Sequence, residues 1–285
     1  MHITVNQHPL YCYTGGKAFD PAKPSVVFIH GVLNDHSVWI LQSRYLANHG
    51  YNVLAIDLPG HGKSAGPCPR SVESAAQTVL DFLSAAGIQK AALIGHSWGS
   101  LIALHAASLA PERITHLALI CTASPMKVSS ALLDSALHNP QAAINMVNQF
   151  SYSSLAPPPS NLGPGTWLYG GSRALMRRVL ASNSKENVFH LGFTACDQYL
   201  EANTAVALIN SAQAAMLFIV GALDQMTPPK AVQPLIQAAP RAKVVTLQGG
   251  HSLMSEAPDA TLFALRDFLS NSHNDAKVSA NVSSH

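Results

Sequence analysis

Continuous apolar runs alternate with segments of helical hydrophobic spacing along the first 123 residues. Such runs are typical of strands buried on both faces, and they lie at 25–29, 51–56, 91–94 and 114–121. The segments with helical spacing lie at 37–48, 71–86 and about 98–110. Two short stretches at the start, 2–5 and 10–14, have the pattern of antiparallel strands. The alternation predicts an α/β fold with a mostly parallel central sheet and helices on both faces.

The pattern changes at about residue 124, where strand-like runs stop and helical spacing takes over. The expected helices lie at 131–137, 141–150, 172–183 and 188–209. The proline-rich stretch 156–165 between them cannot be helical, because proline lacks the backbone N–H that a helix needs. We therefore expect an inserted helical cap over residues 124–212.

Sheet-like texture returns after this insertion, with strands expected at 215–220 and 243–247 and helices at 229–238 and 257–269. Residues 1–123 and 213–270 should thus form one core domain. The last segment, 271–285, is polar and lacks periodicity, so the pattern predicts a disordered tail.

A serine flanked by glycines follows the third apolar run of the predicted parallel sheet. The sequence Gly95-His96-Ser97-Trp98-Gly99 fits the G-x-S-x-G pattern of a nucleophile elbow, between an apolar strand and a good helix. The turn leaves no room for side chains two residues before and after the serine. The N–H groups at the start of the following helix then point at the place where a negatively charged oxygen could develop.

A serine hydroxyl needs a base to remove its proton, and the base needs a third group that fixes its tautomer. The chain supplies candidates in the order Ser97, Asp224 and His251, each directly after an expected strand. This is the chain order of α/β-hydrolases. Asp57 is an alternative acid, but its Pro-Gly-His-Gly surroundings favour a structural loop.

Five stretches in the right order resemble the α/β-hydrolase family over nearly the whole chain, up to about residue 269. They are His30-Gly31, Asp57 to Ser64, Gly95 to Gly99, Gly221 to Pro229, and Gly250-His251 through Glu256-Ala257-Pro258. The resemblance implies the α/β-hydrolase fold with a helical cap. It also implies that Ser97 is the nucleophile, His251 the general base and acid, and Asp224 the orienting acid. The oxyanion hole would consist of the backbone N–H groups of Val32 and Trp98.

Side chains near this expected site have more than one possible role. The indole of Trp98 either lines the acyl pocket or packs against the elbow. His30 and His96 are expected to brace loops by hydrogen bonding. The residues expected at the substrate pocket are His30, Trp98, Phe150, Trp167 and Met226.

The composition of the chain argues against several classes of binding partner and cofactor. Its net charge is only +2 and charged residues make up 11% of the chain, which argues against nucleic acid or an anionic membrane surface. The 14 histidines are scattered without paired metal spacing, and we expect neither a metal nor another cofactor. The four cysteines are far apart, so we expect them to be reduced and buried in a cytoplasmic protein without a signal peptide or membrane span.

The expected activity is hydrolysis of a carboxylic ester or thioester of a small to medium, largely apolar acyl substrate, as in a carboxylesterase. Haloalkane dehalogenases and epoxide hydrolases of this type carry an elbow aspartate, which disfavours both. Proline iminopeptidases have a His-Gly-Gly-Pro type of oxyanion loop, from which His30-Gly31-Val32-Leu33 departs. Carbon–carbon bond hydrolases of ring-cleavage pathways remain an alternative, with hydroxynitrile lyases and perhydrolases as more distant ones. A ligand-sensing protein without activity is an alternative from a different class.

Overall fold

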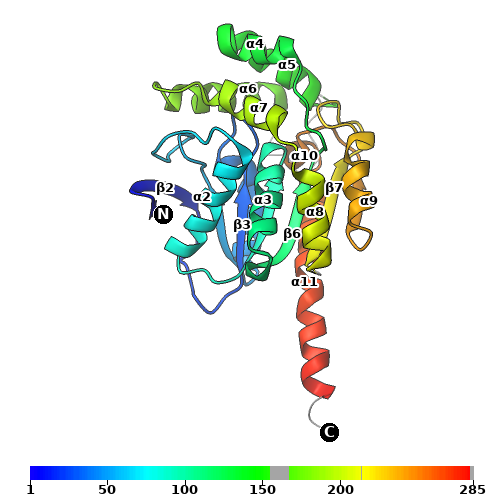
Figure 1. Ribbon diagram of the computed structural model, residues 1–285. Helices are drawn as coiled ribbons and strands as arrows, with labels where there is room; N and C mark the ends of the chain where they lie inside the picture. The colour runs from blue at the N-terminus through cyan, green and yellow to red at the C-terminus, as the bar shows by residue number, and fades with distance from the viewer. Residues whose placement is uncertain (155–166, 213, 283–285) are drawn as a thin grey trace.

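The computed structural model describes residues 1–154, 167–212 and 214–282, with side chains described up to residue 270. Within these residues the core is an eight-stranded sheet in the order β1-β2-β4-β3-β5-β6-β7-β8 (Figure 1). The strands are β1 (His2–Val5), β2 (His8–Tyr13), β3 (Ser25–Ile29), β4 (Asn52–Ile56), β5 (Ala91–His96), β6 (Ile114–Ile120), β7 (Ala215–Gly221) and β8 (Lys243–Leu247). The strands from β3 to β8 are parallel, and β1 and β2 join antiparallel at one edge. The predicted mostly parallel sheet is confirmed.

Helices cover both faces of the sheet, because the central strands β3, β4 and β5 are buried along their whole length and need an apolar layer on each side. One face is covered by α2 (Val72–Ala85), α3 (Trp98–Leu109), α8 (Ala202–Ser211) and α9 (Gln233–Ala238). The other is covered by η1 (His36–Trp39), α1 (Ile40–Asn48), α10 (Leu253–Glu256) and α11 (Pro258–Val282). Two further 3₁₀ turns are η2 (Pro111–Arg113) and η3 (Pro229–Val232).

Four helices form a layer above the carboxyl ends of the parallel strands, at the top of Figure 1. They are α4 (Ser130–His138), α5 (Pro140–Ser151), α6 (Leu168–Ser182) and α7 (Val188–Gln198), and we call them the cap. The cap is tied to the core by an ion pair between Arg178 of α6 and the buried Asp35, with 2.6 Å between Nη2 and Oδ2. The proline-rich stretch 156–165 lies outside the described residues.

The single helix expected over 188–209 is two helices, α7 and α8. The backbone turns extended at Tyr199 (φ −75°, ψ 121°), although no glycine or proline marks the break. The phenol of Tyr199 instead bonds Nδ1 of His105 on α3 at 3.0 Å, and α8 continues along α3 and α9. Tertiary packing therefore breaks the helix, and α8 belongs to the layer over the sheet.

The closing helix is longer than expected, since α11 runs to Val282 where the pattern predicts a disordered tail from residue 271. The sequence after Pro258 contains no glycine or proline before Val282, so nothing in it interrupts the helix. Among the described residues, no helix combines the length and apolar character needed to cross a bilayer.

Candidate active site

Ser97 occupies a strained turn between β5 and α3. Its φ of 54° and ψ of −121° lie in a region that L-residues avoid, at a cost of about 1–3 kcal/mol. A side chain at Gly95 would overlap the carbonyl of Gly99, and one at Gly99 would overlap the carbonyls of Ile29 and His30. Both glycines are therefore required by close backbone approach, as the elbow pattern predicts. The turn holds the Ser97 hydroxyl above the carboxyl end of β5.

Asp224 and His251 meet although they lie 27 positions apart in the chain. Oδ2 of Asp224 accepts from Nδ1 of His251 at 2.8 Å and from the Thr227 hydroxyl at 2.7 Å. Oδ1 accepts from the backbone N–H groups of Met226 and Thr227 at 2.8 and 2.9 Å. Burial by itself raises the pKa of Asp224, but the neighbouring His251 and these hydrogen bonds outweigh it and lower the pKa to about 2. Asp224 is thus ionised, and His251 carries its proton on Nδ1, so Nε2 has a free lone pair.

The backbone of His251 is held as firmly as its ring. Its N–H donates to the carbonyl of Ser151 at the end of α5, at 2.8 Å, and its carbonyl lies 2.8 Å from Nε2 of His96. Burial lowers the pKa of His96 to about 3, so this ring is neutral and donates its Nε2 proton to the carbonyl. His96 therefore braces the His251 loop, the role that the sequence assigns to it.

Val32 and Trp98 are the two residues whose backbone N–H groups the sequence predicts to form an oxyanion hole. Trp98 is the first residue of α3, so its N–H has no acceptor within the helix. Val32 lies in the loop after β3, and Leu33 follows it with a φ of 55°. Among the described residues, neither N–H donates to a protein acceptor. Both groups remain available for an external oxygen.

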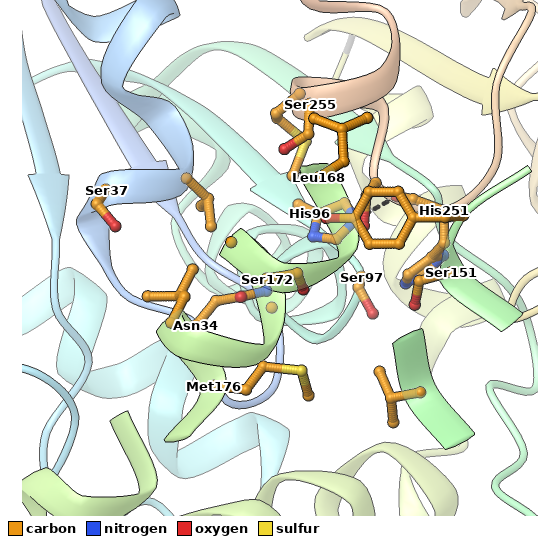
Figure 2. A pocket seen from close by; sticks show the side chains of 18 of the residues that line it. Asn34, Ser37, His96, Ser97, Ser151, Leu168, Ser172, Met176, His251 and Ser255 are labelled. Atoms are coloured by element: carbon orange, nitrogen blue, oxygen red, sulfur yellow. Dashed lines mark hydrogen bonds between the residues drawn. The ribbon is translucent and has the colours of Figure 1, made fainter. Parts of the chain in front are cut away.

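A cavity of about 280 Å³ lies between the strand ends and the cap, and Ser97, His251, His96 and Val32 line it (Figure 2). Apolar side chains from α1, α5, α6 and α7 contribute to the remaining wall, together with several hydroxyl groups. No Asp, Glu, Lys or Arg is part of the lining formed by the described residues. The cavity suits an uncharged ligand of modest size.

Two of the five residues expected at the pocket, Trp167 and Met226, line the cavity, and three do not. His30 is fully buried and accepts from the backbone N–H of Leu58 at 3.1 Å. Trp98 is also fully buried, where its indole packs beside the ring of His61. Phe150 is exposed on α5. The position of a residue in the sequence does not show whether its side chain is buried under the turn at Ser97 or lines the cavity.

The alternative acid, Asp57, has a structural set of partners. Its Oδ1 accepts from the backbone and ring nitrogens of His36, at 2.7 and 2.8 Å, and its Oδ2 accepts from the Lys63 N–H at 2.9 Å. These bonds hold the loop after β4 against the loop after β3. Its surroundings agree with the loop role that the sequence favours.

Within the part of the chain that the structure describes, two groups of side chains have donor atoms close enough to hold a metal ion, His96/Cys121/His251 and Asp35/His36/Asp57. In the first group, burial raises the pKa of the Cys121 thiol well above its ordinary value, so the thiolate that a metal needs is disfavoured. In the second group, Arg178 already provides a positive charge at Asp35. All four cysteines are buried and free, as expected.

The model of the α/β-hydrolase fold family matches residues 24–258. The chain belongs to the α/β-hydrolase family. The curated relatives match only part of it. A dihydrolipoyllysine-residue acetyltransferase component of the acetoin cleaving system of Pseudomonas putida is 39% identical over 110 residues, which are 38% of this chain and 28% of that protein. An epoxide hydrolase of Caballeronia sordidicola is 36% identical over 95 residues, which are 32% of this chain and 29% of that protein. The chain therefore spans less than a third of the length of either relative.

The structural similarity to a solved protein extends over nearly the whole of this chain. The enol-lactonase from Burkholderia xenovorans LB400 superimposes with a TM-score of 0.79, covering 95% of this chain and 100% of that one at 22% identity. At this level of identity the structural similarity shows the fold alone, so the chemistry has to be inferred from the residues of the site.

Proposed function

We propose that this protein is a serine hydrolase that cleaves carboxylic esters, or thioesters, of small to medium, uncharged acyl substrates. The observation that carries the proposal is the 2.8 Å hydrogen bond between Asp224 and His251, beside a cavity that both His251 and Ser97 line. This bond fixes the imidazole tautomer that can accept a proton from a serine hydroxyl.

In the proposed reaction, Ser97 Oγ attacks the substrate carbonyl while Nε2 of His251 takes the hydroxyl proton. The carbonyl oxygen becomes an oxyanion and accepts hydrogen bonds from the N–H groups of Val32 and Trp98. One such donor is typically worth about 10²–10³ in rate. His251 then gives its proton to the leaving alkoxide or thiolate, and the acyl group stays on Ser97.

Hydrolysis of the acyl-enzyme repeats these steps with water. Nε2 of His251 takes a proton from the attacking water, the second oxyanion occupies the same two N–H groups, and the proton returns to Ser97 as the acid leaves. Asp224 stays ionised throughout, because His251 and the hydrogen bonds from Thr227 outweigh its burial and lower its pKa to about 2.

The lining of the cavity supports an uncharged substrate, because an ionised group would lose its hydration there without gaining a charged partner. The proposal also agrees with the structural neighbour, which is an enol-lactonase, because a lactone is a cyclic ester. An epoxide hydrolase is among the relatives, but Ser97 stands here where epoxide hydrolases of this family carry an elbow aspartate.

A substrate panel tests the proposal: p-nitrophenyl esters of increasing chain length, acyl thioesters, ring-cleavage dienones and esters with a charged acyl group, with wild type and Ser97→Ala. Turnover of neutral esters by wild type alone is expected. Turnover of the dienones in place of esters would instead establish a carbon–carbon bond hydrolase. Preference for charged acyl groups would contradict the proposed substrate class.

A further inference from the structure

Glu256 lies in the His251–Pro258 stretch that resembles the family pattern. It is not one of the proposed catalytic residues, and it does not line the cavity. It is the last residue of α10, five positions after His251, and its side chain is half-buried. Among the described residues, no lysine or arginine forms an ion pair with it. Hydrogen bonds must therefore compensate the carboxylate for its lost hydration.

The carboxylate of Glu256 joins the cap to the loop that carries His251. Its Oε1 accepts from the backbone N–H groups of Ser153 and Ser154, which follow α5 of the cap, at 2.6 and 3.0 Å. The Ser153 hydroxyl adds a weaker bond at 3.2 Å. Its Oε2 accepts from the backbone N–H of Gly250, the residue directly before His251. The Glu256 side chain thus bonds both the residues that follow α5 and the residue before His251.

A second set of bonds connects the same two segments without Glu256. The carbonyl of Ser151 accepts from the N–H groups of His251 and Ser252, at 2.8 and 3.2 Å. Gly250 permits this approach, because a Cβ there would lie 2.7 Å from the Ser151 carbonyl oxygen and 2.9 Å from the Ser153 nitrogen. Ser151 and His251 both line the cavity, as Figure 2 shows. The cap thus bonds directly to the backbone of His251.

We propose that Glu256 is a positioning residue that couples the cap to His251: its carboxylate clamps Ser153 and Ser154 to Gly250 and so fixes the imidazole opposite Ser97. The inference rests on the proposed function, since it assumes that His251 is the base. It assigns the cap a role beyond covering the substrate, because the placement of the base depends on the docked end of α5. Displacing a reacting group by 1 Å can cost about 10²-fold in rate.

The test compares Glu256→Ala, Glu256→Gln and the control Glu112→Gln, which changes an exposed glutamate of η2. Each protein is assayed for kcat and KM with p-nitrophenyl acetate, for the rate of fluorophosphonate labelling of Ser97, and for unfolding in urea. We expect Glu256→Ala to lower kcat and the labelling rate by about 10- to 100-fold while KM changes less than about threefold. Glu256→Gln should lie between, because its amide oxygen can accept on one side only. The control should match wild type.

The split between kcat and KM separates positioning from a purely structural role. A structural role would weaken resistance to urea and leave the labelling rate per folded molecule unchanged, which would overturn the inference. If Glu256→Ala fails to fold, the isosteric Glu256→Gln decides, and a kcat and labelling rate within twofold of wild type would overturn it. Wild type that neither hydrolyses esters nor reacts at Ser97 would overturn the proposed function together with this inference.

Discussion

Replacing Asp224 by asparagine should disable the base without removing it. The two backbone N–H groups at Oδ1 keep the amide oxygen of the new residue on their side. Its NH₂ group then faces Nδ1 of His251 and the Thr227 hydroxyl, where Oδ2 accepted two hydrogen bonds. Two donors cannot bond each other, so the imidazole proton moves to Nε2. A protonated Nε2 cannot take the proton of Ser97.

The expected loss in kcat is about 10⁴-fold, the typical cost of the wrong tautomer in a serine–histidine–aspartate relay, or about 5.5 kcal/mol of transition-state stabilisation. Asp224 is not part of the cavity lining, so KM should stay within about threefold. The assay is p-nitrophenyl ester hydrolysis, with Asp134→Asn, at an exposed position of α4, as the matched control. A folded Asp224→Asn protein with a kcat within tenfold of wild type would refute the assigned tautomer.

Three further predictions concern stability, substrate contact and the elbow. Burial lowers the pKa of both His61 and His96 to about 3, so below about pH 6.5 only the unfolded chain takes up their protons. Each of these two histidines should therefore lower the free energy of unfolding by about 1.4 kcal/mol per pH unit as the pH falls from about 5.5 to 4. Urea titrations in which the stability of His61→Phe depends on acid pH as strongly as that of wild type would contradict this prediction. Trp167 is 58% exposed and lines the cavity, whereas Trp39 and Trp98 are fully buried. A bound ester analogue should therefore reduce the quenching of tryptophan fluorescence by acrylamide. Equal quenching with and without the analogue would show that Trp167 is not part of the binding site. Gly99→Ala should prevent soluble expression or lower the melting temperature strongly, because its methyl group would overlap two carbonyls; a melting temperature within 2 °C of wild type, as measured by calorimetry, would argue against the elbow geometry.

Local patterns were sufficient where backbone sterics decide the structure. The glycines at 95 and 99 are needed by close approach, and the apolar runs are needed by a sheet covered on both faces, so both can be read from the sequence. Ser97, Asp224 and His251 could be proposed together because each of them directly follows an expected strand.

Features that depend on tertiary packing could not be predicted in the same way. The break at Tyr199 comes from its contact with α3, and no local signal marks it. The placement of His30 and Trp98 beneath the elbow, instead of in the cavity, depends on how the loops after β3 and β4 fold over them. The bonds from Ser153 and Ser154 to Glu256 join residues more than 100 positions apart, so no local pattern indicates them. The bond from the Thr227 hydroxyl to Asp224 is local, but no motif in the sequence marks it.

The central claim is that Ser97 acts as a nucleophile activated by His251. The most direct test is to treat wild type and Ser97→Ala with a fluorophosphonate and to measure the mass of the intact proteins and of their peptides. The account predicts one phosphonyl group on wild type, located on Ser97, and none on Ser97→Ala, which should also lose ester hydrolysis. Labelling at another residue, or ester hydrolysis by Ser97→Ala at the wild-type rate, would contradict it.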